Sequence, residues 1–340
     1  MSDAVRSVVQ SLASGNPERP DGEAMQAAFE AIFRGESDPS LTAAFLTSLA
    51  MRGESASDIA AGAAVMRAHV RRVAAPEGAI DTCGTGGLAW VSLNTSTAAA
   101  FVAAGAGAVV AKHGNRSVPP KTGSADVLEA LGVNLNPTDA QLEASFDRAG
   151  VAFMFAPAHH ASMKHVAPVR KALGIRTVFN LLGPLANPAG ARRQLLGVYS
   201  ELWMIPYAKA LRRLGSERAW IVHGRDGMDE ISTTGPTMIT ELKNGEIDTF
   251  EIRPEDFGLP VVDPQVLRGG TSAENSAALL RVLEGKPSPF ADLVALNAGA
   301  ALTIAGRAAD LADGLAQARA SIASGRALAA LEALKSATNA

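Results

Sequence analysis

The sequence predicts an α/β protein with an N-terminal helical domain and a larger α/β domain built on a mainly parallel central sheet. Three observations lead to this fold class. Apolar residues recur at helical spacing over the first 70 residues, short apolar runs alternate with helical stretches in the middle of the chain, and the end returns to Ala- and Leu-rich helix. Strands that alternate with helices form largely parallel sheets, whose ligands collect at the carboxyl ends of the strands.

The first domain is predicted to consist of short helices. Gly35 and Gly53 stand where helix C-caps are expected, and Ser55 to Asp58 form a capping-box pattern ahead of a third helix. Two apolar series recur at helical spacing: Met25, Ala28, Phe29, Ile32 and Phe33, and then Leu41, Phe45 and Leu49.

A domain boundary is expected where Pro76 and Gly78 interrupt the helical pattern. We therefore expect residues 1–72 to form the helical domain, joined by a helical segment around residues 160–190. Residues 73–340 are expected to form the α/β domain.

Strands are predicted from short apolar runs in the second domain. Met238 to Ile252 reads as a hairpin around Asn244-Gly245, and Leu311 to Leu334 reads as helix. The remaining strand-like runs are Ala79-Ile80, Ala108 to Ala111, Val151 to Phe155, and Ala219 to Val222.

Composition excludes several classes of protein. The 340 residues are 47% hydrophobic, which allows a substantial core, and a net charge of −3 argues against broad nucleic-acid binding. The single cysteine, Cys83, excludes an intrachain disulfide framework and suits a packing role better than a nucleophilic one.

Residues 1–15 lack the apolar core of a signal peptide, so a cytoplasmic location is expected. The uncharged run 88–111 could span a membrane in length, but polar residues interrupt it, so we expect a buried helix and no membrane association.

The segment from Thr82 to Ala125 is the strongest functional signal. It holds 44 residues without one Asp or Glu, although the frequency of acids in the chain, 34 in 340, would give about four. It carries Lys112, His113, Arg116 and Lys121. This composition predicts a site for a polyanion, and a small phosphorylated substrate is the first expectation.

Two elements within this segment suit phosphate. A glycine-rich loop at residues 84–87 precedes Asn94 to Thr97, a polar helix start whose amides attract anions, and this start is a plausible pyrophosphate cradle. Lys112 and its neighbours should then leave the carboxyl end of a strand close by. The loop also matches the dinucleotide pattern G-x-G-x-x-A, but the acid expected about 20 residues later is missing, which disfavours that interpretation.

Further candidate groups follow later strands. His159, His160 and His165 lack the spacing of a helical zinc site, while Arg170, Lys171 and Arg176 suit anion binding or a solvated helix face equally well. Asp229 and Glu230 follow the last parallel strand as hard oxygen ligands for Mg²⁺, and a polar turn is the alternative.

The ordered set of motifs resembles the anthranilate phosphoribosyltransferase family along essentially the whole chain. The resemblance implies a homodimer paired through the helical domain, a fold related to the pyrimidine nucleoside phosphorylases, and a site at the hinge between the domains. The matching motifs are Gly84 to Gly87, Asn94 to Thr97, Lys112 to Arg116, Gly123 to Glu129, Met163 to Arg170, Arg176 to Leu185, and His223 to Glu230.

The resemblance also implies a reaction and its residues. Phosphoribose would pass from phosphoribosyl pyrophosphate to anthranilate in tryptophan biosynthesis, with two Mg²⁺ ions held by Ser96, Asp229 and Glu230. The anthranilate contacts would be Gly84, His113, Asn115 and Arg170. The contacts of phosphoribosyl pyrophosphate would be Gly84, Gly86, Gly87, Leu88, Ser92, Asn94, Thr95, Ser96, Thr97, Lys112 and Ser124.

The chain departs from the family pattern at two places. Leu88-Ala89 stand where an acid and a glycine are usual, and Pro119-Pro120 stand where serines are usual. The prolines remove two hydroxyls and two backbone donors that could face phosphate. Three consequences stay open: an altered loop solution, a different acceptor, or weakened catalysis. Two other functions also stay open, phosphorolysis of a pyrimidine nucleoside and a catalytically silent paralogue that binds nucleic acid.

Overall fold

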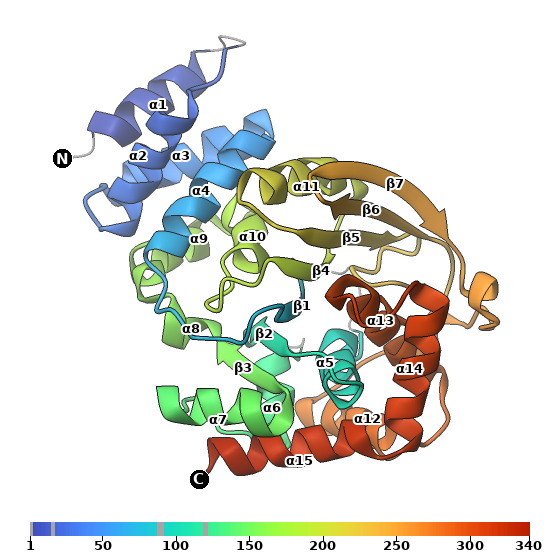
Figure 1. The fold of residues 1–340 in the computed structure, drawn as a ribbon. Coiled ribbons are helices and arrows are strands. Elements are labelled where there is room, and N and C mark those ends of the chain that lie inside the picture. Colours follow the sequence, from blue (N-terminus) through green and yellow to red (C-terminus); the bar gives the residue numbers. More distant parts are fainter. Residues whose placement is uncertain (1–2, 15–17, 87–91, 118–121) are drawn as a thin grey trace.

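A computed structural model describes residues 3–14, 18–86, 92–117 and 122–340. It contains a seven-stranded sheet in the order β3-β2-β1-β4-β5-β6-β7 (Figure 1). The first five strands in the chain are parallel, and β6 and β7 pair antiparallel at one edge. The strands are β1 (Ile80–Gly84), β2 (Val110–Gly114), β3 (Val151–Phe155), β4 (Arg193–Gly197), β5 (Arg218–Gly224), β6 (Thr237–Lys243) and β7 (Glu246–Ile252).

The N-terminal helices share an apolar core with one face of β4, β5 and β6. They are α1 (Asp3–Ala13), α2 (Gly22–Phe33), α3 (Pro39–Arg52) and α4 (Ala56–Ala68). The capping box predicted at Ser55 and Asp58 is present, and Gly35 and Gly53 have the positive φ angles of helix ends. Phe29 meets Phe45 edge to face with ring centroids 5.1 Å apart, in the middle of this cluster.

A later segment contributes to the same helical cluster. Val169 of α9 and Leu181 of α10 lie in the apolar core formed by α1 to α4. The helices of this segment and the next are α8 (Ala156–His159), α9 (Ala167–Leu173), α10 (Phe179–Leu182) and α11 (Met204–Arg213), with 3₁₀ turns η1 (Ala161–His165), η2 (Gly183–Leu185) and η3 (Glu201–Trp203).

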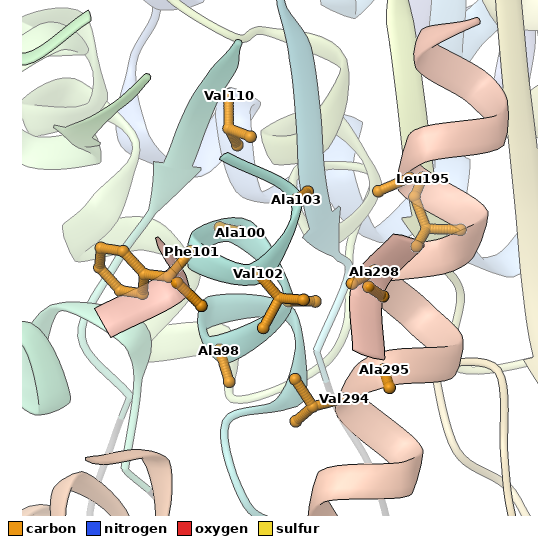
Figure 2. Close-up of a cluster of buried hydrophobic side chains, with 14 of the residues drawn as sticks. Ala98, Ala100, Phe101, Val102, Ala103, Val110, Leu195, Val294, Ala295 and Ala298 are labelled. Carbon is orange, nitrogen blue, oxygen red and sulfur yellow. The ribbon is translucent and has the colours of Figure 1, made fainter. Parts of the chain in front are cut away.

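The other helices cover the sheet and surround α5 (Thr95–Gly105). Phe101 and Val102 of α5 belong to one core with Leu195 of β4 and with Val294 and Ala298 of α13 (Figure 2). Because α5 is buried between the sheet and α13, its N-terminus is held in a fixed position. The remaining elements are α6 (Ser124–Ala130), α7 (Asp139–Ala149), η4 (Pro254–Phe257), η5 (Pro264–Leu267), α12 (Ser272–Leu283), α13 (Pro289–Ala305), α14 (Leu311–Ala323) and α15 (Arg326–Thr338).

The structure differs from the sequence-based expectations of the fold at two strands. Strand β4 was not predicted at all. The helical character expected from Leu311 to Leu334 is confirmed, with α14 and α15 separated at Gly325, where φ is 75°. Strand β2 runs on through Lys112 and His113, which were expected to lie beyond its end. The strand at Val151–Phe155 and the hairpin around Asn244-Gly245 are confirmed. Across the described ranges, no helix combines the length and apolarity needed to cross a membrane.

Candidate functional site

A cavity of about 320 Å³ lies at the carboxyl ends of β1, β2 and β4, beside the N-terminus of α5. The loop after β5 that carries Asp229 and Glu230 closes another side of it. The sequence-predicted site residues that line this cavity are Gly84, Gly86, Ser92, Asn94, Ser96, Thr97, Lys112, His113, Asn115, Ser124, Asp229 and Glu230.

Lys112 is a buried cation inside β2. Its side chain is 3% exposed, and Nζ donates to the Thr82 carbonyl and, at 3.3 Å, to Ser96 Oγ. Burial lowers the pKa of the ammonium group, while the negative charge of nearby Asp81 opposes that shift. The structure therefore places the positive charge at the floor of the cavity, and the expectation that Lys112 leaves the strand end was wrong.

Two glycines at the carboxyl ends of β1 and β4 allow the loop that carries Asp229 and Glu230, the acidic loop, to lie close against these strands. Gly84 and Gly197 are register partners in β1 and β4. A Cβ atom on Gly84 would lie 2.7 Å from Asp229 Oδ2, and one on Gly197 would lie 1.5 Å from the Asp229 carbonyl oxygen. Any side chain at position 197 would therefore collide with the loop backbone.

The loop that carries Asp229 and Glu230 is hydrogen-bonded to the glycine-rich loop and to the start of α5. Asp229 Oδ2 accepts a hydrogen bond from the Gly86 amide at 3.0 Å, and Glu230 Oε1 accepts one from the Ser96 amide at 3.2 Å. On its other side, Asn297 of α13 accepts from the Ile231 amide and donates to the Ile231 carbonyl. The loop is thus held between the N-terminus of α5 and α13.

The carboxylate of Glu230 is suited to a cation. Although part of the residue is accessible to solvent, its Oε2 atom is buried and makes no well-formed hydrogen bond among the described residues, with the Thr95 hydroxyl as a neighbouring donor that lowers the pKa slightly. Burial, with the charge of Asp229 as a second cause, raises the pKa of Glu230 to about 8. A buried oxygen without a partner beside a second carboxylate and the hydroxyl of Ser96 offers the hard donors that Mg²⁺ prefers. In the described ranges, no group of three or more His, Cys, Asp or Glu side chains could hold a metal ion.

His113 makes a buried pair with His160. Their Nε2 atoms lie 3.2 Å apart, so one ring donates to the other. Burial, followed by the neighbouring imidazoles, lowers the pKa of His113 to about 3, and burial likewise lowers that of His160 to about 4. His159 instead contacts the Arg71 carbonyl through Nδ1 at 2.9 Å. His159 and His160, two of the three histidines noted in the sequence, therefore have different partners and do not form one cluster.

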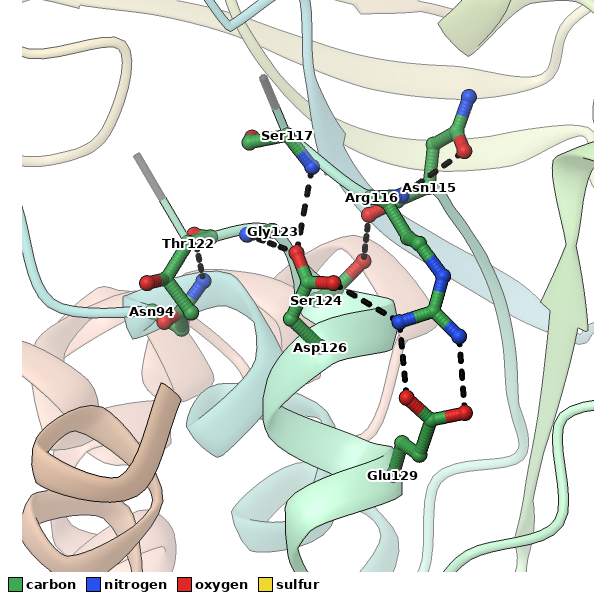
Figure 3. A network of polar contacts seen from close by, with 9 residues as sticks. All are labelled: Asn94, Asn115, Arg116, Ser117, Thr122, Gly123, Ser124, Asp126 and Glu129. Carbon is green, nitrogen blue, oxygen red and sulfur yellow. Dashed lines mark hydrogen bonds and ion pairs between the residues drawn. The ribbon is translucent and has the colours of Figure 1, made fainter. Parts of the chain in front are cut away.

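Arg116 is neutralised within the protein. Its guanidinium contacts Asp126 at 2.9 Å and Glu129 at 2.8 Å, both on α6 (Figure 3). These carboxylates raise the pKa of Arg116 above its ordinary value. Arg116 lines the cavity, but its charge is already paired. Because both carboxylates already accept hydrogen bonds from it, Arg116 contributes less free positive charge to the predicted polyanion site than the sequence alone suggests.

Several predicted site residues lie elsewhere. Thr95 is fully buried and does not line the cavity. Arg170 also lies outside it, on α9, with its guanidinium 5.7 Å from the centroid of the Phe179 ring. Gly87 and Leu88 fall outside the described residues, as do the departures Leu88-Ala89 and Pro119-Pro120.

Sequence reasoning missed two residues that shape the cavity. Gly197 was overlooked because β4 was not predicted. Asn297 was overlooked because it stands in an Ala- and Leu-rich helix. An Asn in an otherwise apolar helix is a signal that could have been used, because a buried carboxamide requires hydrogen-bond partners.

Comparison with known proteins places the chain in a family. A model described as "Glycosyl transferase family, a/b domain" matches residues 77–328, and "Glycosyl transferase family, helical bundle domain" matches residues 6–70. Anthranilate phosphoribosyltransferase of Rubrobacter xylanophilus is 52% identical over 329 residues, which cover 96% of each chain.

Solved structures agree along the full length. The crystal structure of anthranilate phosphoribosyltransferase from Thermus thermophilus superposes with a TM-score of 0.92 at 41% identity, covering 99% of this chain and 100% of that one. The enzyme of Saccharomyces cerevisiae, solved in complex with PRPP and Mg, gives a TM-score of 0.90 at 29% identity and covers 100% and 99%. These matches confirm the predicted fold class.

Proposed function

Since the chain belongs to the anthranilate phosphoribosyltransferase family, we infer that it transfers the phosphoribosyl group of phosphoribosyl pyrophosphate to anthranilate. The products are N-(5-phosphoribosyl)anthranilate and pyrophosphate, in tryptophan biosynthesis. The observation that carries this conclusion is the identity of 52% with such an enzyme over almost the whole chain. The cavity supports it, because amides, a buried cation and two carboxylates meet there beside a helix N-terminus.

We propose that one side of the cavity binds the donor. Lys112 and the amides at the start of α5 suit its pyrophosphate group, because they present positive charge where the leaving group gains negative charge. The donor contacts in this proposal are Gly84, Gly86, Gly87, Leu88, Ser92, Asn94, Ser96, Thr97, Lys112 and Ser124. Thr95 is left out because it is fully buried and does not line the cavity.

Ser96, Asp229 and Glu230 are proposed to hold Mg²⁺, with two ions in each site. The unpartnered Oε2 atom of Glu230 supports this assignment, since a bound cation would satisfy it. When bound, Mg²⁺ supplies neutralisation of the pyrophosphate charge. The hydrogen bond from the Ser96 amide to Glu230 connects the proposed Mg²⁺ ligands to the N-terminus of α5. The metal and the helix N-terminus would therefore stabilise the pyrophosphate charge at the same place.

Gly84, His113, Asn115 and Arg170 are proposed to bind anthranilate. The guanidinium of Arg170 is half-buried and forms no ion pair with any described carboxylate, so it suits the carboxylate of the acceptor. The lowered pKa of His113, about 3, keeps its imidazole neutral at neutral pH. A neutral ring beside the acceptor adds no charge that competes with Arg170.

The reaction needs little acid–base catalysis. The aromatic amine of anthranilate is uncharged at neutral pH and attacks the anomeric carbon, whose bond to pyrophosphate breaks while the new C–N bond forms, and the amine proton then passes to solvent. Lys112 and the α5 amides stabilise the departing charge. The residues of the cavity therefore act mainly by positioning the two substrates.

The remaining properties are proposals that rest on the family. The chain would pair as a homodimer through its helical domain, formed by residues 1–72 with the segment around 160–190, and would work in the cytoplasm. Residues 73–340 would form the phosphoribosyl-binding domain. We expect no binding to nucleic acid, because Lys112 is buried and the exposed Arg116 is already paired with Asp126 and Glu129.

A fluorescence assay tests the function. Purified protein with Mg²⁺ and phosphoribosyl pyrophosphate should consume the fluorescence of anthranilate, and omission of either component should stop the reaction. Persistent fluorescence would contradict the proposal. Phosphate-dependent release of a free pyrimidine from a nucleoside would instead support the phosphorylase alternative.

A further inference from the structure

Asn94 does not cap the helix that it precedes. It is the N-cap residue of α5, yet its side chain makes no hydrogen bond to the first helical turn within the described structure. Its Nδ2 donates to the Thr122 carbonyl at 3.0 Å (Figure 3), and its Oδ1 accepts from Asn275 Nδ2 at 2.9 Å. An N-cap Asn usually satisfies an amide of its own helix, so this arrangement requires an explanation.

These two bonds belong to a closed ring of four hydrogen bonds. The Thr122 hydroxyl donates to the Gly270 carbonyl at 2.7 Å, and the Gly270 amide donates to Asn275 Oδ1 at 2.8 Å. From there the ring returns through Asn275 Nδ2 to Asn94. Each of the four residues donates one hydrogen bond and accepts one.

The ring fixes the orientation of both carboxamides. A backbone N–H can only donate, so the Asn275 atom that faces Gly270 must be Oδ1, and Nδ2 must face Asn94. The Thr122 carbonyl can only accept, so Asn94 must present Nδ2 to it. Neither amide can rotate by 180° without placing two acceptors or two donors against each other. The ring therefore holds both side chains in one orientation.

The ring connects segments that are far apart in the chain. Asn94 and Asn275 are separated by 181 positions, and Asn275 is 1% exposed near the start of α12. The backbone reinforces the same junction, since the Leu93 amide donates to the Leu267 carbonyl at 3.1 Å. A Cβ on Gly269 would lie 2.3 Å from the Ser92 carbonyl oxygen. The segment before α12 thus supports the loop that leads into α5.

We propose that Asn275 is a positioning residue for donor binding, an inference that rests on the proposed function. Two amides of this first turn are already bonded, that of Thr95 to the Leu93 carbonyl and that of Ser96 to Glu230 Oε1. By holding the Asn94 side chain against Thr122, Asn275 keeps that side chain off the Thr97 amide, which stays available to an anion. It also ties the β1–α5 connection to the start of α6. Asn275 does not line the cavity, so it acts through Asn94 and Thr122.

Asn275→Ala and the isosteric Asn275→Asp test this role. Calorimetric titration with phosphoribosyl pyrophosphate and Mg²⁺, without acceptor, should show about tenfold weaker binding for both variants, the effect of about one hydrogen bond. The KM for anthranilate should stay within about twofold. Asn275→Asp keeps the shape and the bond from Gly270 but removes the donor to Asn94, so it remains informative if Asn275→Ala folds poorly. Ser276→Ala is the matched control, because this hydroxyl on the same helix donates to the Ala273 carbonyl and bonds to no member of the ring.

A double-mutant cycle separates positioning from general destabilisation. Asn94→Ala and Asn275→Ala together should weaken donor binding no more than Asn94→Ala alone, because Asn275 acts through Asn94. Additive losses, or donor binding equal to that of the unmodified protein, would overturn the inference while leaving the proposed function intact. Failure of the unmodified protein to bind the donor would overturn both.

Discussion

The residues proposed to bind the donor and those proposed to bind the acceptor are held in place differently. Donor-side groups come from the α/β region and are cross-linked by internal hydrogen bonds, such as those from Lys112 to Thr82 and from Ser96 to Glu230. The acceptor side is divided. His113 lines the cavity, whereas Arg170 lies on α9 and contacts Phe179. Under this proposal, the geometry of the donor site is fixed within one region of the chain, while acceptor binding depends on the position of α9 beside it.

Removing the acidic pair should have the largest effect. Asp229→Asn combined with Glu230→Gln should lower kcat/KM by at least about 1,000-fold, because charge neutralisation of the leaving group is lost. Initial rates across a Mg²⁺ titration measure the effect. A control with the same charge change, Glu246→Gln with Asp248→Asn on exposed β7, should behave like the unmodified protein. Unaltered Mg²⁺ dependence in the first variant would remove the metal assignment.

Arg170→Ala should distinguish acceptor binding from donor binding. Loss of a charge-assisted hydrogen bond should raise the KM for anthranilate by about 10- to 100-fold, with the KM for the donor within about twofold. Steady-state kinetics with each substrate varied in turn provide the measurement. Lys171→Ala, at the next and exposed position, is the control. Equal losses for both substrates would contradict the comparison.

The buried imidazole pair predicts an acid-sensitive fold. The pKa of His160 is about 4 in the folded protein and near 6.5 when unfolded, so below about pH 6.5 the unfolded chain binds protons that the folded one excludes. Stability should therefore fall as pH drops from about 6.5 to about 4. Glu230, with a pKa of about 8, acts in the opposite direction over part of this range.

Because Glu230 opposes the histidines, the diagnostic quantity is a difference between two proteins. The free energy of urea unfolding of the unmodified protein minus that of His160→Gln should fall by about 2 kcal/mol between about pH 7 and about pH 4.5. The exposed His165→Gln is the control. A difference that stays constant with pH would show that His160 is not held neutral.

Arg116→Gln should have the smallest effect. Since Asp126 and Glu129 already neutralise this cation at the surface, the KM for the donor should change by less than about threefold, at both low and moderate salt. Donor kinetics at two salt concentrations measure this. A large rise in the donor KM would mean that Arg116 contributes to the donor side after all.

Local patterns predicted much of the fold because they have local causes. The Asn244-Gly245 turn and the capping box at Ser55 depend on neighbouring residues, and both were predicted correctly. Strand β4 was missed because its sequence, Arg193 to Gly197, is short and begins with polar residues. The strand is buried because it lies between β1 and β5, a position that its own sequence pattern does not indicate.

Lys112 and Asn275 show why the site was only partly predictable. A lysine was expected to end a buried strand, but acceptors on β1 and α5 let it remain inside. The partners of Asn275 lie far away along the chain, so no window of sequence contains the ring. The sequence indicated where the motifs are, but the residues that hold the motif side chains in place are brought to them only by tertiary contacts.

The paired glycines beneath the acidic loop limit how this enzyme could be redesigned. At Gly197 even one methyl group would overlap the backbone of Asp229, and at Gly84 it would displace the Asp229 carboxylate. Mutagenesis libraries that aim at new acceptors should therefore leave codons 84 and 197 untouched and diversify the wall around Asn115. Homologues recruited as parents for such work can be screened first for glycine at both places.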